Sequence, residues 1–298
     1  MPTTTTAPTG VLLGNFTPGT PEWNAARTGL SVTATEIAAI VGLSPWMSRY
    51  ELWHKKSGLP TPPFQMTSAI EWGNRLEDVV AQKWADEHEG YCIEQAGTWR
   101  HTDREWQRAT PDRLLTTGRG QTVELLELKT SPQGDGWGPS GSDEIPIYYR
   151  CQVQWQLSTL GLDTCHVAVL ISGHDYREYV IDRDDEDAAT LVKAAAEFLD
   201  TVRRGQVPDI DGSSHTYDTV RLQPDRYDPV DVEIPGPIAA DYEVCGQQYK
   251  AAADEYTRAK SQLLTALGTG KNAIHLGRRI AYRIADETGA TKSLQPAR

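Results

Sequence analysis

The strongest constraint on the fold lies in residues 122–129, TVELLELK, where apolar and charged side chains alternate. Alternation with a period of two is typical of a β-strand that has two different faces. Glu127 and Lys129 therefore point to one face, while Leu126 and Leu128 point to the other, into the core. The pattern predicts a sheet in which an acid and a lysine share one face of an otherwise apolar strand.

A second strand is predicted over residues 106–115, and the segment GRG at residues 118–120 forms the turn between the two strands. This turn lies midway between Asp112 and Glu127, so a symmetric antiparallel hairpin places these residues opposite each other. Opposed Cβ atoms lie about 5 Å apart, and two carboxylates that close repel unless a cation separates them or one is protonated. Mg²⁺ meets this need because it prefers oxygen ligands, with Mn²⁺ as a substitute.

Lys129 would then lie beside the metal, where it could orient the attacking water or balance the charge of a scissile phosphate. The alternative is a surface hairpin with a solvated ion pair, because an acid and a lysine two residues apart are common on strands. The Pro111-Asp112 pair lies upstream, where the hairpin would place Asp112 opposite Glu127. With this pair included, the catalytic and the surface interpretations carry about equal weight.

Glu77 and Gln152 are further candidates on predicted helices. The helix over residues 68–89 presents Glu77 on a largely apolar face, formed by Gly73, Val80, Ala81 and Trp84. A buried acid there needs a partner, either a metal or an arginine in a salt bridge. Gln152 borders the apolar stripe of a helix over residues 147–160, where its amide could bond a phosphate or a water of the metal site, or cap a strand edge.

Arg27 precedes a helix predicted to begin near Thr33, because Thr33, Thr35 and Glu36 lie in a segment, TATE, that fits a capping box. A helix N-terminus offers free N–H groups and positive dipole charge, and arginine binds phosphate through paired hydrogen bonds. The segment could therefore bind a phosphate, although an arginine near a helix start is usually an ordinary surface residue.

The order of elements predicts an α/β domain with a mixed central sheet flanked by helices, over residues 21–206. Residues 1–20 are rich in Thr, Pro and Gly and are predicted to be a disordered leader. Residues 207–237 are predicted to be a linker or arm. Residues 238–298 are predicted to be a helical C-terminal extension, with one strand or a terminal hairpin over residues 275–285, and this extension could cover the core or build a homo-oligomer. Strands are predicted over residues 91–101, 106–115, 122–129, 165–172 and 176–182.

Composition restricts the partners and the location. The formal net charge of -12 argues against a nucleic-acid partner, but it does not exclude a local basic groove. The four cysteines form no CxxC pair, which argues against a clustered metal site. The chain has no apolar run long enough to cross a bilayer and no signal peptide, so we expect a cytoplasmic protein with no membrane partner.

Five motifs occur in one order along the chain: EWNAAR with TATEI at residues 22–37, GLSPW with ELW at residues 42–53, WGNRLE at residues 72–77, TPD with ELK at residues 110–129, and YYRCQVQ at residues 148–154. Together they resemble the lambda exonuclease and YqaJ-like viral recombinase family, within the PD-(D/E)xK nucleases. The resemblance covers about residues 20–205 and implies a restriction-endonuclease-like core.

The resemblance implies an exonuclease that degrades the 5′-ended strand at double-stranded DNA ends. The product would be a 3′ overhang for a single-strand annealing protein. Metal ligands would be Asp112, Glu127, Glu77 and the backbone carbonyl of Leu128, with Gln152 as a supporting contact.

Arg27, Thr35 and Thr110 would hold the terminal 5′-phosphate. The family's prototype has a further phosphate-binding arginine after the core lysine, whereas residues 130–140 here contain none. The alternatives are an endonuclease built on the same core and a catalytically inactive DNA-binding module.

Overall fold

The computed structural model describes residues 8–17, 19–116, 122–223 and 227–297. The chain divides into two compact units, Met1–Tyr227 and Asp228–Arg298. The helices of the first unit are α1 (Pro21–Arg27), α2 (Ile37–Ile40), α3 (Arg49–Lys56), α4 (Ser68–Glu87), α5 (Ile147–Leu160), α6 (Asp185–Arg204) and α7 (Ser214–Val220). Its strands are β1 (Val11–Gly14), β2 (Val32–Thr33), β3 (Cys92–Gln95), β4 (Thr98–Arg100), β5 (Gln107–Ala109), β6 (Arg113–Thr116), β7 (Thr122–Ser131), β8 (Thr164–Ile171) and β9 (Asp175–Asp182).

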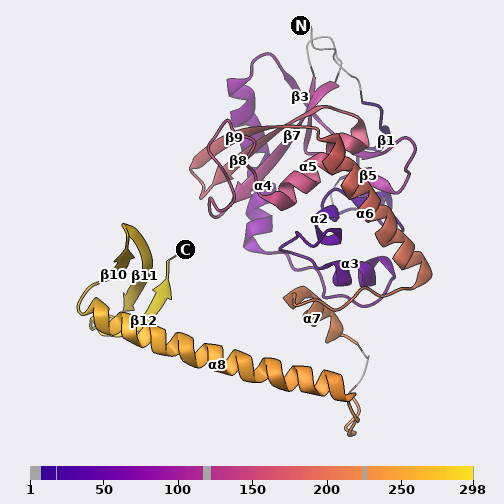
Figure 1. Cartoon of the computed structure of the whole chain (residues 1–298). Coiled ribbons are helices and arrows are strands. Elements are labelled where there is room, and N and C mark those ends of the chain that lie inside the picture. Colours follow the sequence, from indigo (N-terminus) through magenta and orange to yellow (C-terminus); the bar gives the residue numbers. More distant parts are fainter. Residues whose placement is uncertain (1–7, 18, 117–121, 224–226, 298) are drawn as a thin grey trace. The chain divides into compact units, whose positions relative to one another are not determined.

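A five-stranded mixed sheet in the order β3-β6-β7-β8-β9 forms the centre of the first unit (Figure 1). β7 and β8 run parallel, and the other neighbouring pairs run antiparallel. Helix α5 connects the parallel strands, because a parallel pair needs a crossover. The α/β architecture predicted from the sequence, a mixed central sheet with flanking helices, is therefore confirmed.

The two faces of β7 meet different helices. Leu126 and Leu128 belong to a buried cluster with Val80 and Trp84 of α4. The opposite face belongs to a larger core that includes apolar residues of α5 and α6. Since side chains alternate along a strand, Glu127 and Lys129 lie on the α5 side of the sheet.

The first unit also contains a smaller sheet in the order β1-β4-β5-β2, and two of the predicted strands are each split between this sheet and the central one. The segment predicted as one strand over residues 91–101 turns at Gly97, with φ +72°, and becomes β3 and β4 in different sheets. Residues 106–115 are likewise shared between β5 and β6. β1 pairs with β4, so the prediction of a disordered leader was wrong for Val11–Gly14, an apolar run that completes this sheet.

The helix predicted over residues 147–160 agrees with α5, and glycine supplies the left-handed C-cap of both α5 and α6. α5 ends at Gly161 (φ 70°) and α6 at Gly205 (φ 64°). The helix predicted near Thr33 instead begins at Ile37, because Thr33 lies in β2. Half of the expected capping box remains, since the Thr33 N–H donates to Glu36 Oε2 at 3.0 Å.

The first unit continues past its predicted end at residue 206. Within the predicted linker, residues 207–237, α7 packs against α3 and buries Thr216 and Thr219. Ser213 caps this helix by accepting the His215 N–H. The Asp- and Pro-rich composition of this segment gave no indication of the seven-residue helix α7. The first unit ends at Tyr227.

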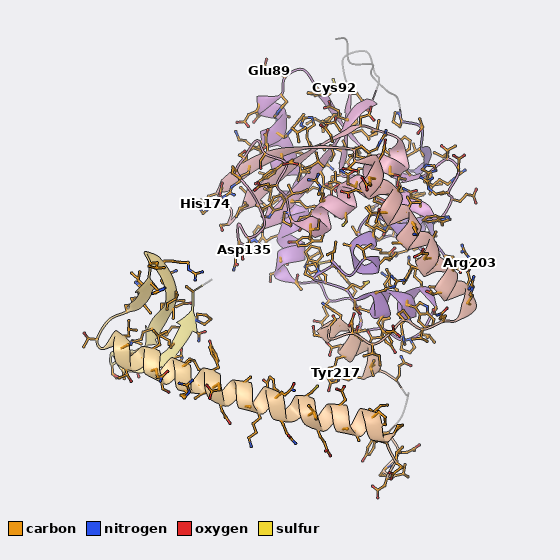
Figure 2. The ribbon with its side chains drawn as sticks, in the orientation of Figure 1. Glu89, Cys92, Asp135, His174, Arg203 and Tyr217 are labelled. Atoms are coloured by element: carbon orange, nitrogen blue, oxygen red, sulfur yellow. The ribbon has the colours of Figure 1, made fainter. Side chains whose placement is uncertain are left out.

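The second unit consists of helix α8 (Gly236–Leu267) and a three-stranded antiparallel sheet, β10 (Asn272–His275), β11 (Arg278–Ala285) and β12 (Thr291–Pro296). No residue of α8 is buried, and Figure 2 draws its side chains as sticks. The helix predicted in this extension agrees with α8, and the strand or hairpin predicted over residues 275–285 is part of a larger sheet that also includes β12.

The four cysteines are free thiols, and Cys151 and Cys165 are buried. Among the helices of the described ranges, none combines the length and the apolar character needed to cross a bilayer.

Candidate active site

Asp112 and Glu127 meet at the end of the hairpin formed by β6 and β7. The register pairs Arg113 with Leu126, so one step further brings Asp112 level with Glu127, as the sequence predicts. Asp112 Oδ2 accepts the backbone N–H of Leu128 at 2.7 Å, which fixes this carboxylate against β7. The predicted turn at residues 118–120 lies outside the described residues.

Glu127 is 1% exposed and both of its carboxylate oxygens accept hydrogen bonds. Oε1 accepts from Lys129 Nζ and from Gln152 Nε2. Oε2 accepts from Gln156 Nε2 at 2.8 Å. Residues four apart on a helix share a face, so α5 directs both amides at one carboxylate. Gln152 therefore binds the acid itself in this structure.

Burial and like charge determine the protonation of this cluster. Burial and the neighbouring Glu127 raise the pKa of Asp112 to about 8, while Lys129 opposes the shift. Burial alone would lower the pKa of Lys129, but the Glu127 and Asp112 carboxylates outweigh it and hold that pKa above its usual value. The Lys129 Nζ also lies 4.9 Å from the centroid of the Tyr149 ring, which favours the cation. Lys129 is thus a charged ammonium between two acids.

Glu77 of α4 forms an ion pair with Arg113, with Oε1 2.7 Å from Nη1. The Arg113 side chain is only 5% exposed, and its second nitrogen pairs with Asp78 at 2.6 Å. The Glu77 charge contributes to the raised pKa of Asp112, so the two acids are near neighbours. Of the two partners considered for Glu77 from the sequence, the structure contains the arginine.

Arg27, Thr35 and Thr110 form one hydrogen-bonded cluster. Arg27 Nη1 donates to Thr110 Oγ1 at 2.9 Å, and Nη2 donates to Thr35 Oγ1 at 3.3 Å. The guanidinium also lies 4.3 Å from the Trp23 ring centroid. Thr110 stands two residues before Asp112, so the cluster adjoins the acidic site along the chain. The structure brings together the three residues for which the sequence predicted one site.

Comparison with known proteins assigns this region to a family. Residues 22–163 match the family model of the YqaJ-like viral recombinase domain. Over 209 residues the chain is 31% identical to the uncharacterized protein YqaJ of Bacillus subtilis strain 168. Residues 22–163 form a YqaJ-like viral recombinase domain. The alignment covers 68% of this chain and 63% of the relative, so the chain spans less than two thirds of that protein.

Solved structures of two exonucleases are similar to this chain, with a lower sequence identity than the Bacillus subtilis protein. The alkaline exonuclease of Laribacter hongkongensis has a TM-score of 0.48 and 21% identity, over 63% of this chain and 94% of that chain. A phage-related exonuclease of Haemophilus somnus 129PT has a TM-score of 0.41 and 14% identity, over 59% of this chain and 96% of that chain. Both TM-scores are below 0.5. The family is shown instead by the match of residues 22–163 and by the Bacillus subtilis relative.

The residues of the YqaJ-like domain fit a divalent cation through oxygen atoms. Within the described ranges, no three His, Cys, Asp or Glu side chains are arranged as a metal site. Asp112 and Glu127 supply two carboxylates, and Leu128 between Glu127 and Lys129 supplies a carbonyl. Burial first and the Glu127 charge second raise the pKa of Asp112, and a cation beside both carboxylates would remove that repulsion. Hard cations such as Mg²⁺ take this type of ligand.

Sequence reasoning missed Arg113 and Tyr149. Arg113 begins the strand RLLT, and a cation in such an apolar strand signals a buried ion pair. Tyr149 was assigned to the apolar stripe of its helix, and nothing in the spacing connects its ring to Lys129. Both residues belong to the YqaJ-like domain and contact groups of the candidate site.

Proposed function

We propose that the chain is a Mg²⁺-dependent deoxyribonuclease that hydrolyses linear duplex DNA from its 5′ ends and leaves 3′ overhangs. The observation that carries this proposal is the convergence of Asp112, Glu127 and Lys129 in one buried cluster beside the middle of β7. Two acids and a lysine at this spacing supply the ligands and the positive charge that phosphodiester hydrolysis needs.

Asp112, Glu127 and the Leu128 carbonyl would hold the cation, which supplies Lewis-acid stabilisation of the phosphoryl oxygens when bound. Mn²⁺ would substitute for Mg²⁺. Arg113 pairs with Oε1 of Glu77, so Glu77 would join these ligands through its other carboxylate oxygen or by releasing Arg113.

Lys129 places an ammonium beside Glu127, where it can donate a hydrogen bond to the attacking water and balance the charge of the scissile phosphate. Gln152 and Gln156 hold the Glu127 carboxylate in one orientation without adding charge. Lys129 and the two glutamines thus position the reacting groups before substrate arrives.

The 5′ end would be recognised by Arg27, whose guanidinium can form charge-assisted hydrogen bonds worth about 1.5–3 kcal/mol each. Thr35 and Thr110 already orient that guanidinium. We expect 5′-phosphorylated duplex to be degraded faster than 5′-hydroxyl duplex, and Arg27→Ala to remove most of this difference. Equal losses on both substrates would mean that Arg27 only braces the fold, which thermal melting of the variant would reveal.

The direct test is an end-labelled linear duplex incubated with Mg²⁺ and then with EDTA. We expect release of mononucleotides from the 5′-ended strand with Mg²⁺ and none after chelation. Covalently closed duplex is the control, because an exonuclease leaves it intact and an endonuclease cuts it. Binding without cleavage would make the chain an inactive DNA-binding module. A single-strand annealing protein would use the 3′ overhangs, and co-purification of the two proteins would test that partnership.

A further inference from the structure

The sheet of the second unit has one covered face and one open face. Ala273 and Ala281, which pair across β10 and β11, are buried. On the same side, Ile280 and Leu294 line a small cavity with Leu263 of α8, because a register shift opposite Ile280 brings it to the side of its neighbour Ala281. The sheet rises from the C-terminal end of that helix, as Figure 1 shows. α8 therefore covers one face, and the residues that alternate with these project from the other.

The open face carries an aromatic ring between amides. Tyr282 of β11 is paired with Asn272 on β10 and with Gln295 on β12, and directly opposed residues share a face. The guanidinium of Arg279 lies 5.4 Å from the Tyr282 ring centroid, so it stands on the same face. Ile274, which pairs with Arg279, is 64% exposed. The row Asn272, Tyr282 and Gln295, with Arg279 beside it, is polar and charged, whereas a protein core is built from apolar side chains.

This sheet is basic although the chain is acidic. Residues 271–296 contain five Lys and Arg and two acids, whereas the chain has a formal net charge of -12. Within the described residues, none of these five cations forms an ion pair. Asp286, one of the two acids, accepts hydrogen bonds inside its own turn. Arg283 donates to the Gly268 carbonyl. The other four are exposed, and no acid in the described part of the chain forms an ion pair with them: Lys271, Arg278, Arg279 and Lys292.

We propose that the open face of the β10–β12 sheet binds single-stranded DNA, with a base stacked on Tyr282 and a phosphate contacted by Arg279. Unpaired cations fit a polyanion, since binding releases its condensed counterions. The Tyr282 ring is half-buried, and its accessible part can stack on unpaired bases, which a duplex conceals within its helix. The choice of DNA over RNA rests on the proposed function, whose product is a single-stranded overhang.

The test measures binding by the full-length chain in EDTA, so cleavage does not contribute. The probes are fluorescein-labelled oligothymidylate of 20 nucleotides and a blunt duplex of equal length, followed by fluorescence anisotropy. The test variant is Arg279→Gln with Tyr282→Leu. The matched control makes the same two kinds of change on α8, Arg258→Gln with Tyr249→Leu, at exposed positions of the same unit.

We expect the test variant to raise the Kd for oligothymidylate at least about tenfold, since base stacking on an aromatic ring is worth that much. Its Kd for duplex should change less than about threefold, and the control should stay within about twofold of wild type. The slope of log Kd against log salt should fall by about 0.7 for the lost phosphate contact. Arg279→Gln alone, at an exposed position, should lower the slope even if the double variant is poorly folded.

Unchanged oligothymidylate binding in Arg279→Gln and in a folded double variant would overturn the proposal. An equal loss in the control, or an equal loss on duplex, would also overturn it. The two proposals fail separately: if wild type never cleaves DNA but the test variant loses oligothymidylate binding, the nuclease assignment fails and the binding face stands. Cleavage with unaltered single-strand binding gives the opposite result.

Discussion

Replacing Lys129 by methionine tests whether its ammonium is the counter-charge of the buried acids. Methionine keeps most of the side-chain length and removes the charge. The Lys129 side chain is 15% exposed and that of Glu127 is 2% exposed, so the variant leaves a buried carboxylate without its cation. Breaking a buried ion pair in this way costs about 3–5 kcal/mol. Because Gln152 and Gln156 still donate to Glu127, we expect the lower value, about 3 kcal/mol.

The assay is urea denaturation of Lys129→Met and wild type in EDTA and in excess Mg²⁺, with nuclease rates measured alongside. In EDTA the loss of about 3 kcal/mol corresponds to a melting temperature lower by about 6–12 °C. Mg²⁺ at a hundred times its Kd should return about 2.7 kcal/mol, because a bound cation replaces the lost charge. The nuclease rate should fall at least about a hundredfold, and it should stay low in Mg²⁺, because the metal does not replace the donor to water.

The double variant Glu127→Gln with Lys129→Met is the control. It removes both charges, so it should be more stable in EDTA than the single lysine variant. If Lys129→Met lies within about 1 kcal/mol of wild type in EDTA, the ammonium is not the counter-charge, and the electrostatic account of the site is wrong.

Three further outcomes follow from contacts elsewhere in the first unit. Glu77→Gln should lower Mg²⁺-dependent cleavage at least about tenfold if this acid joins the metal site; unchanged Mg²⁺ affinity by calorimetry, with an unchanged rate, would make it purely structural. A chain ending at Tyr227 should stay folded and active, whereas one ending at Gly205 should be less soluble because it lacks α7, and equal behaviour of the two would refute the boundary. Burial raises the pKa of Glu36, but the charges of Lys56 and Lys55 outweigh burial, so the net pKa is depressed. The ionised Glu36 therefore stabilises the fold above about pH 4.5, and this stabilisation is lost as the pH falls below that value. Glu36→Gln should therefore be about 3 kcal/mol less stable at pH 7, and the difference should shrink in acid-melting experiments below pH 4.

The hairpin register could be predicted because it depends on two local facts, the period-two pattern of residues 122–129 and the central position of the turn. The division of residues 91–101 could not, since a strand pattern does not say which sheet a strand joins. Gly97 was the one local signal of that break. The partner of Glu77 was left open because a buried acid accepts a metal or an arginine equally well in sequence terms. Arg113 lies 36 residues away and meets Glu77 only through tertiary packing.

The terminal sheet was predicted only in part, as one strand or a terminal hairpin over residues 275–285. Its inward face is made of small residues, such as Ala273 and Ala281, so apolar alternation is weak. Its outward face mixes a ring, amides and an arginine, and neither face stands out by hydropathy. The long helix before it was easier to predict, because helix-favouring residues continue over several turns.

The two glutamines on Glu127 have a consequence for how quickly the site can exchange its cation. They hold both carboxylate oxygens from α5, so the side chain loses its rotamer freedom when the protein folds. An incoming ion then has no side-chain entropy left to remove at this ligand, which is what preorganisation means in thermodynamic terms. Because amides keep the same charge across the working pH range, this geometry should persist through repeated loss and recapture of the ion between turnovers.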